Sequence, residues 1–250
     1  MKLEEVVEAI PRTELLYLED SYLRRFEGRV FRAVLGKKRS AYVVLDRTIF
    51  HPKSGGQPSD RGLISSPKFK VQVRKVMTMR SIIVHWGKLI EGAVDEESVV
   101  GEIDWDSRYL YMRRHTAAHL LDYCLSQVTG KTVETFDSWL GEACYVGYKG
   151  ETPSTASLKE AIELGNRMIV RGASVKTESV SREELVRRVL NAPNIYRLPP
   201  LPSYRLVTIE RCDPIPCAGT HLKNIKEVSF IVLKGVEVAE GKFRVYYDVR

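Results

Sequence analysis

The sequence predicts an α+β fold with a small β-barrel-like part followed by a mixed helix and strand part. In residues 13–104, short β-type runs are separated by turns rich in glycine, proline, serine and charged residues, a pattern typical of a small β unit. From residue 105 onward, helical and strand patterns segregate rather than alternate strictly, which favours an α+β arrangement. We therefore expect three regions: a helical extension over residues 1–12, a β-barrel-like domain over 13–104 and an α+β domain over 105–250.

The extension is expected to be a short amphipathic helix. Leu3, Val6, Val7 and Ile10 recur at helical spacing, and Pro11 ends the run. The apolar face fits two roles equally, covering the barrel or contacting another subunit, so the oligomeric state stays open.

The expected strands of the barrel-like domain are short and separated by turns. A loop over residues 50–62 is rich in turn formers, and its adjacent Gly55 and Gly56 permit unusual dihedral angles or a close approach to a ligand. Chemistry alone favours an ordinary surface loop. The strand runs are 30–35, 42–45, 71–76, 82–86 and 98–103.

A long helix is expected over residues 107–128, with Asp106 or Ser107 as its N-cap and Gly130 beyond its C-terminus. Residues 132–148 have β-type composition. A capping box that begins at Ser157 predicts a helix that runs toward residue 171. A second capping box, at Ser181, predicts another helix, which Pro193 must end. The last strands are expected over residues 204–209, 227–233 and 243–247.

Composition excludes several classes of protein. The 250 residues are 44% hydrophobic and 28% charged, as in ordinary globular proteins. No apolar run approaches the roughly 20 residues of a membrane span, and the N-terminus lacks the features of a secretory signal. Four scattered cysteines form no dense disulfide framework. We therefore expect a reduced, cytoplasmic protein that does not contact a membrane.

The net charge of +7 is compatible with a polyanionic partner, but equally with a basic protein that binds no charged ligand. Each candidate phosphate-facing residue could also lie on a solvated strand or loop face. These candidates are Lys37, Lys38, Arg39, Lys68, Lys70, Arg74, Lys75 and Arg80.

Two short motifs have the spacing of metal ligands. His115 and His119 lie four residues apart on the predicted helix, so both imidazoles project from one face. Cys217 and His221 flank a turn that Gly219 permits. Either pair alone is weak evidence, since such histidines are often structural and such a cysteine is often a small buried apolar residue. Together they form a His3Cys set, which suits a tetrahedral Zn²⁺ ion.

The remaining histidines and cysteines are not expected to bind metal: His51, His85, Cys124, Cys144 and Cys212. Thr116 follows His115, so the helix motif also lacks the glutamate that serves as the base in HExxH metalloproteases.

These motifs resemble the editing domain of alanyl-tRNA synthetase and its free-standing relatives, the AlaX proteins. The segment 104–121 resembles the family helix that carries the histidine pair, and 217–221 resembles its Cys-Gly-Gly-Thr-His motif, with Ala218 in place of the first glycine. The segment 54–58 with Asp60 and Gly62 resembles its glycine-rich Gly-Gly-Gln loop. The likeness covers residues 13–247.

The resemblance implies a medium-length AlaX protein with an N-terminal β-barrel and a zinc-containing editing domain. It implies hydrolysis of mischarged tRNA(Ala), chiefly Ser-tRNA(Ala) and also Gly-tRNA(Ala), with Zn²⁺ held by His115, His119, Cys217 and His221. Because four protein ligands fill a tetrahedral ion, they favour a zinc that organises the pocket over one that supplies a metal-bound hydroxide.

Two polar residues are candidates for substrate recognition, Gln57 in the glycine-rich loop and Thr135 after the histidine helix. Acceptance of serine and rejection of alanine require a partner for one hydroxyl group; either residue could instead be structural. Two other functions remain open: a noncatalytic zinc-stabilised tRNA-binding module and a zinc hydrolase of a small ester.

Overall fold

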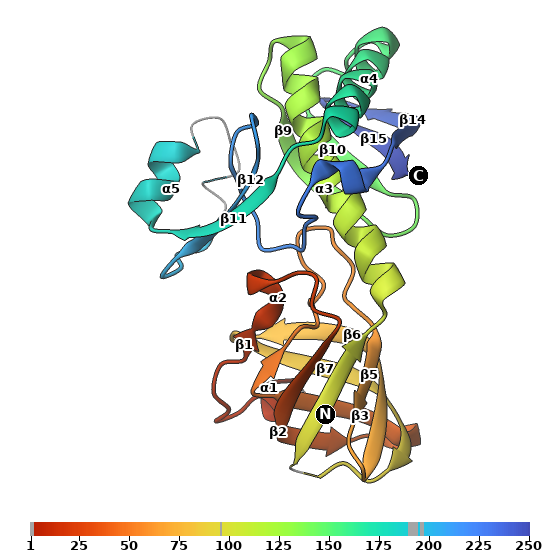
Figure 1. Ribbon diagram of the computed structural model, residues 1–250, viewed down its shortest axis with the longest axis vertical. Helices are drawn as coiled ribbons and strands as arrows, with labels where there is room; N and C mark the ends of the chain where they lie inside the picture. Colours follow the sequence, from red (N-terminus) through yellow and green to blue (C-terminus); the bar gives the residue numbers. More distant parts are fainter. Residues whose placement is uncertain (1–2, 96, 190–194, 196–197) are drawn as a thin grey trace. The chain divides into compact units, whose positions relative to one another are not determined.

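The computed structural model describes residues 3–95, 97–189, 195 and 198–250 (Figure 1). Contacts between Cα atoms divide the chain into two compact units. One contains residues 1–54 and 58–110, and the other contains 55–57 and 111–250. The three residues 55–57 of the glycine-rich loop therefore cluster with the second unit. The domain boundaries expected from the sequence are not tested by this division and stay a prediction.

The first unit is a closed six-stranded barrel with the strand order β2-β3-β7-β6-β5-β8, which confirms the expected barrel-like part. A parallel pair of two-residue strands, β1 and β4, lies outside this order. The strands are β1 (Glu14–Leu15), β2 (Arg25–Leu35), β3 (Ser40–Leu45), β4 (Arg47–Thr48), β5 (Gly62–Ser65), β6 (Phe69–Met79), β7 (Ile82–Gly92) and β8 (Ser98–Ile103). The helical segments are α1 (Leu3–Val6), α2 (Leu16–Glu19) and the 3-10 turn η1 (Lys37–Arg39).

Side chains alternate across the barrel wall as a strand period of two requires. In β6, Phe69, Val71 and Val73 are buried while Lys70 and Arg74 are exposed. The inward side chains pack into one apolar cluster with residues of β3, β5 and β8. β5 was missed in the sequence because four residues with only Leu63 and Ile64 as apolar members give no alternation to detect.

The short helix α1 covers the outside of the barrel. Val6 and Val7 are buried against Val44, Ile82 and Val84. The open choice for the extension is thereby resolved for these residues, which pack on the barrel.

Helix α3 (Trp105–Thr129) begins two residues earlier than expected. The carboxylate of Asp104 accepts hydrogen bonds from the backbone N–H (3.3 Å) and the hydroxyl (2.7 Å) of Ser107, so Asp104 caps the helix and the expected caps Asp106 and Ser107 lie inside it. The fully buried Arg108 fixes the start of the helix within the first unit by donating to Asp60 Oδ1 (3.0 Å), the Ser21 carbonyl (3.1 Å) and the Ile49 carbonyl (2.6 Å). At the other end Gly130 has a positive φ of 66°, as expected beyond a helix C-terminus.

The second unit contains two antiparallel sheets with the orders β14-β15-β10-β9 and β11-β12-β13. Its strands are β9 (Glu134–Trp139), β10 (Tyr145–Lys149), β11 (Val175–Val180), β12 (Tyr204–Ile209), β13 (Ile215–Pro216), β14 (Ile231–Ala239) and β15 (Lys242–Val249). Its other helical segments are α4 (Thr155–Arg171), α5 (Arg182–Arg188) and the 3-10 turn η3 (Ile225–Val228).

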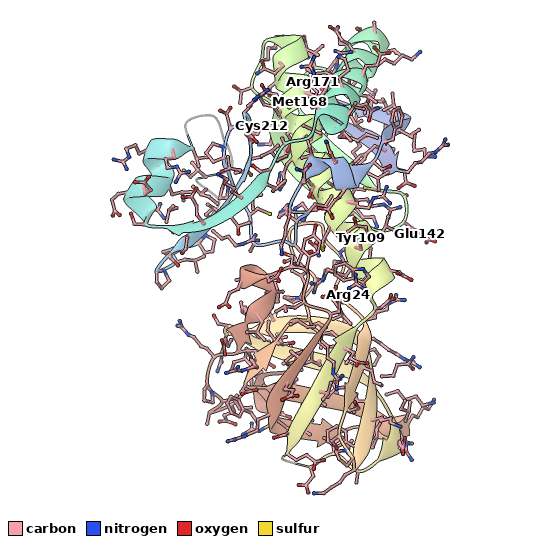
Figure 2. The ribbon with its side chains drawn as sticks, viewed as in Figure 1. Arg24, Tyr109, Glu142, Met168, Arg171 and Cys212 are labelled. Carbon is pink, nitrogen blue, oxygen red and sulfur yellow. The ribbon has the colours of Figure 1, made fainter. Side chains whose placement is uncertain are left out.

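Helix α4 is joined to the larger sheet through Asn166. The amide of Asn166 donates to the Ile231 carbonyl (2.9 Å) and accepts from the Ile231 N–H (2.8 Å). Met168, labelled in Figure 2, places its sulfur 3.9 Å from the thiol of Cys124 on α3. The helices expected in this region are therefore present and packed, and the mixture of helices and strands confirms the α+β class.

Three boundaries in this unit differ from expectation. The cap of α4 is Ser154, three residues before the expected cap Ser157, because the Ser154 hydroxyl accepts from the Ser157 N–H. Helix α5 ends at Arg188, whereas Pro193, expected to end it, lies outside the described residues. The strand expected over 227–233 begins only at Ile231, because the Asn224 capping box turns the preceding residues into η3.

None of the helices among the described residues has both the length and the apolar character of a membrane span.

The buried imidazole of His85 should make the first unit sensitive to acid. Its Nδ1 donates to the Val43 carbonyl (3.0 Å) and its Nε2 accepts from the Thr48 hydroxyl (2.9 Å), so the neutral ring has both partners. Burial lowers the pKa of His85 from 6.5 to about 4. Below pH 6.5 the unfolded chain therefore binds the proton more readily, and this contribution to stability is lost as the pH falls from 6.5 to about 4.

We expect the free energy of unfolding to fall by up to about 1.4 kcal/mol per pH unit from this group in that window. Urea unfolding of the wild type and of His85→Gln at about pH 7.5 and about pH 4.5 measures it. The difference between the two proteins should shrink toward acid. A constant difference across this range would contradict the assignment.

Candidate metal centre

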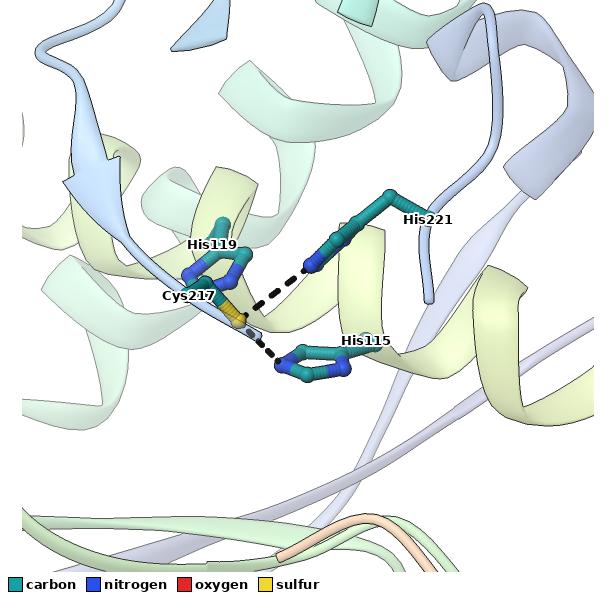
Figure 3. A group of neighbouring side chains, drawn as sticks. All are labelled: His115, His119, Cys217 and His221. Atoms are coloured by element: carbon teal, nitrogen blue, oxygen red, sulfur yellow. Dashed lines mark hydrogen bonds between the residues drawn. The ribbon is translucent and has the colours of Figure 1, made fainter. Parts of the chain in front are cut away.

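Helix α3 presents His115 and His119 on one face, as their spacing predicts. Their ring centroids are 5.0 Å apart and the rings are nearly stacked. The ring of His221 lies 4.3 Å from that of His115 and 5.0 Å from that of His119. Residues separated by about a hundred positions in the sequence therefore meet in the second unit (Figure 3).

Cys217 completes the group. Its sulfur lies 3.4 Å from His115 Nε2 and 3.4 Å from His221 Nε2 (Figure 3). One ligand atom from each of His115, His119, Cys217 and His221 lies within 4.8 Å of the others. The structure thus brings together all four residues that the sequence singled out, and no other such group occurs among the described residues.

The group has the dimensions of a tetrahedral metal site. With zinc–sulfur bonds of about 2.3 Å and zinc–nitrogen bonds of about 2.0 Å, two ligands at the tetrahedral angle lie about 3.5 Å apart, close to the observed separations. Both ring nitrogens of His119 are buried without a hydrogen-bond partner among the described residues, a state that would be costly unless something else binds there. The residues present therefore fit a metal ion of the zinc type.

Two neighbours set the orientation of two imidazoles. His115 Nδ1 donates to the Gln57 side-chain carbonyl (3.0 Å), which leaves Nε2 free to accept on the side of Cys217. Thr116 has its hydroxyl 3.5 Å from His221 Nδ1 and accepts from the Leu222 N–H (3.2 Å). Metal-binding histidines commonly direct the second nitrogen to such a partner, which fixes their tautomer.

The loop that carries Cys217 is held by Arg205 of β12. The Arg205 guanidinium donates to the carbonyls of Cys217 (3.0 Å) and Gly219 (2.9 Å). The backbone carbonyl of Arg205 accepts from the Cys217 N–H (3.0 Å). A Cβ at Gly219 would lie 2.1 Å from the His115 ring, so only glycine permits this close approach. Ala218 is exposed, so the methyl group that replaces the family glycine takes up no space inside the site.

Burial also determines the charge state of these groups. Burial, aided by the positive charge of Arg205, lowers the pKa of His119 to about 4, which keeps its imidazole neutral. Burial raises the pKa of the Cys217 thiol, while the Gly219 N–H and Arg205 oppose that shift. A metal ion would instead favour the thiolate. Burial also raises the pKa of Asp122, one turn beyond His119, to about 7, against the hydrogen bond from Tyr148.

A cavity of about 800 Å³ lies beside this group, within the second unit. His115, His119 and Cys217 form part of its wall, and Thr135 of β9 lines it as well. Gly55 and Gly56 also contribute to the wall. Gly56 has a positive φ of 79°, and a Cβ there would lie 2.2 Å from the Ser138 hydroxyl. The backbone of this loop thus packs directly on β9, and the Gly56 carbonyl accepts from the N–H of Leu140, the residue after that strand (3.0 Å).

Gln57 occupies a different place from the one its predicted role suggests. Its side chain is fully buried, donates to the Thr220 hydroxyl (2.8 Å) and accepts from the Thr220 N–H (3.1 Å) as well as from His115. It is absent from the residues that line the cavity. A role in positioning His115 therefore fits Gln57 better than direct recognition of a substrate.

The residues expected not to bind metal lie apart from the group. His85 is in the barrel with its two hydrogen bonds, and His51 is buried there beside the Ser54 hydroxyl (3.3 Å). Burial raises the pKa of Cys124, Cys144 and Cys212 to about 12, so their thiols stay protonated near neutral pH. Sequence reasoning missed the supporting residues Thr116 and Arg205. Thr116 could have been noticed, because it occupies the position of the motif where a metalloprotease has its glutamate.

Comparison with known proteins adds independent evidence. Residues 2–107 match the family of class II (A) tRNA synthetases, and residues 204–246 match the second additional domain of threonyl and alanyl tRNA synthetases. The chain is 36% identical to an alanyl-tRNA editing protein, AlaX-M, from Saccharolobus solfataricus, over 95% of this chain and 99% of that protein. This chain belongs to the AlaX-M family.

The alanine–tRNA ligases of Pyrobaculum neutrophilum and Pyrococcus abyssi are also similar to the chain, at 31% and 33% identity. The alignments cover 94% and 97% of this chain. They span about a quarter of those ligases, 27% and 26% of their length. The family resemblance noted in the sequence is thereby confirmed.

Removal of one member of the four-residue group should abolish tight metal binding. We expect the wild type to retain about one zinc ion per chain after dialysis. His221→Ala should lose most of it, because only three ligands remain and water can enter the vacated coordination position. Metal analysis with a chromogenic chelator measures both. His85→Gln, which removes a buried histidine elsewhere, is the matched control and should retain its metal. Full retention of zinc by His221→Ala would contradict the assignment.

Proposed function

We propose that the protein hydrolyses the ester bond of mischarged tRNA(Ala), chiefly Ser-tRNA(Ala) and also Gly-tRNA(Ala). Membership of a family of alanyl-tRNA editing proteins supports the reaction class, an aminoacyl-tRNA deacylation. The observation that carries the proposal is the His3Cys group on the wall of a cavity of about 800 Å³. A cavity in the range of about 300–1,000 Å³ holds a drug-sized ligand, so this one has room for an aminoacyl group together with part of its nucleotide.

The cofactor in this proposal is Zn²⁺, held by His115, His119, Cys217 and His221. The mixed nitrogen and sulfur donors suit zinc. When bound, zinc would supply a positive charge that can polarise or orient the ester. Since four protein ligands fill a tetrahedral shell, the proposal assigns the ion mainly the task of organising the pocket.

The chain's own residues keep this pocket in shape. Gln57 and Thr116 orient His115 and His221, and Arg205 fixes the loop after β13. In the hydrolysis, water adds to the ester carbonyl, the bond to the ribose oxygen breaks, and the products are a free amino acid and a tRNA with a free terminal hydroxyl. A preformed pocket favours this step by placing the ester without reorganisation.

Thr135 is the proposed partner of the serine hydroxyl. It lines the cavity and lies opposite Tyr148 in the β9–β10 register, so both side chains leave the sheet on the same face. A site that hydrogen-bonds a hydroxyl discriminates strongly against an analogue without it. Alanine esters would therefore bind less well than serine esters, because the methyl group of alanine would cover the Thr135 hydroxyl without bonding to it, whereas a glycine ester has no side chain to cover it.

In this proposal, part of the net charge of +7 serves to bind the phosphates of tRNA(Ala). Phosphate contacts by lysine and arginine supply affinity that falls with salt. Lys68 pairs with Asp95 (3.4 Å) and Lys70 with Glu91 (2.8 Å), which reduces their availability. Arg74, Lys75 and Arg80 are exposed and remain better candidates for phosphate contacts.

A deacylation assay separates the proposed function from its alternatives. We expect hydrolysis of Ser-tRNA(Ala), little hydrolysis of Ala-tRNA(Ala), and loss of activity after treatment with a chelator. Tight tRNA binding without turnover would instead indicate a noncatalytic module. Hydrolysis of a small seryl ester at the rate found for Ser-tRNA(Ala) would indicate a small-ester hydrolase.

Replacement of Thr135 by valine tests hydroxyl recognition at constant side-chain volume. We expect Thr135→Val to lower kcat/KM for Ser-tRNA(Ala) by about tenfold or more, because a buried hydroxyl loses its partner. Activity on Gly-tRNA(Ala), which lacks the hydroxyl, should change little. Thr132→Val makes the same chemical change at an exposed position of the same cavity and should be neutral. Equal loss on both substrates would argue against this role.

A further inference from the structure

Asp122 lies on the cavity wall beside the candidate metal centre. It follows His119 by three residues on α3, so both side chains project from neighbouring positions of one helix face. The Tyr148 hydroxyl donates to Asp122 Oδ1 (2.8 Å), and Oδ2 lies 4.0 Å from His119 Nδ1. One oxygen is thus fixed by the protein, and the other is directed toward the metal centre.

In the part of the chain that the structure describes, the carboxylate of Asp122 has no lysine or arginine to compensate its charge. Its side chain is only 19% exposed, and among the described residues neither a lysine nor an arginine forms an ion pair with it. A poorly solvated carboxylate is costly unless a cation neutralises it. The charges of the other two acidic residues that line the cavity are stabilised. Asp137 pairs with Arg244 (3.0 Å), and Asp213 is exposed to solvent.

The aminoacyl ester carries a group of the required chemistry. Its α-ammonium is separated from the ester carbonyl by one carbon, so an ammonium at Asp122 would bring the carbonyl close to His119. Tyr148, which holds Asp122, lies opposite Thr135 in the β9–β10 register. The proposed partner of the side-chain hydroxyl therefore faces the same part of the cavity.

We propose that Asp122 binds the α-ammonium group of the aminoacyl ester and thereby places the ester carbonyl beside the metal centre. This inference rests on the proposed deacylase function and adds a limit to its substrate class. Esters with a free α-amino group are accepted, whereas N-acylated esters, including peptidyl-tRNA, are rejected because they lack the positive charge and carry additional bulk.

The test compares two substrates in two proteins. Wild type and Asp122→Asn are assayed on Ser-tRNA(Ala) and on N-acetyl-Ser-tRNA(Ala), whose α-nitrogen is neutral. Asparagine keeps the shape and can still accept from Tyr148. Because a charge-assisted hydrogen bond is lost, we expect Asp122→Asn to lower kcat/KM for the free ester by about tenfold to hundredfold. Activity on the acetylated ester should stay at its low wild-type value.

Binding supplies a readout that does not depend on turnover. A nonhydrolysable analogue, adenosine that carries serine through a 3′-amide, should bind the wild type about tenfold or more tightly than its N-acetylated form. Asp122→Asn should lose this preference. Asp213→Asn removes the same charge from an exposed position of the cavity and should retain the preference for the analogue with a free amino group. Metal content is measured for each variant.

Four outcomes would overturn the inference. Equal loss of activity on both esters would make Asp122 a general base rather than an ammonium ligand. Loss of metal from Asp122→Asn would make it a support for His119. An unchanged preference in Asp122→Asn, or its equal loss in Asp213→Asn, would remove any specific role for Asp122. If the wild type cleaves neither ester, the deacylase function fails, and the binding preference alone still decides whether Asp122 recognises the ammonium.

Discussion

The side-chain amide of Gln57 joins the two halves of the candidate metal centre. Its carbonyl accepts from His115 on α3 and from the Thr220 N–H, and its NH2 group donates to the Thr220 hydroxyl. A single neutral group thereby fixes the tautomer of one histidine and the position of the loop that carries Cys217 and His221. Because Gln57 is fully buried, loss of any of these hydrogen bonds would leave a polar atom unsatisfied, so the arrangement is tightly specified.

The sequence predicted most elements whose signal is local. The period of α3, the glycine after it and the strand 204–209 depend on neighbouring residues, and the structure contains them. Elements that depend on distant partners were harder to predict. Strand β5 has few apolar residues and exists because β6 and β8 pair with it on both sides. The start of β14 was missed for a local reason, since the Asn224 capping box turns the preceding residues into η3.

The candidate site shows the same division. Its four ligand residues could be found because each pair has a fixed spacing and the residue types are those that bind zinc. Gln57 was singled out as well, but for substrate recognition. The orienting roles of Arg205, Thr116 and Gln57 could not be predicted, because these residues act through contacts between segments far apart in the chain. Asp122 follows His119 at helical spacing and could have been noticed. Only the structure shows that no lysine or arginine of the described residues pairs with it.

The two adjacent glycines of the loop differ in the sequence change they can tolerate. Both have positive φ, yet a Cβ at Gly55 would meet no atom of the described residues within 4 Å, whereas a Cβ at Gly56 would overlap Ser138 of β9. Asparagine, which adopts this backbone region more readily than most residues, could therefore replace Gly55 over evolutionary time without moving its neighbours. At Gly56 any side chain would push the loop away from the strand and displace the Gln57 amide. Steric overlap alone therefore excludes every other residue at this position.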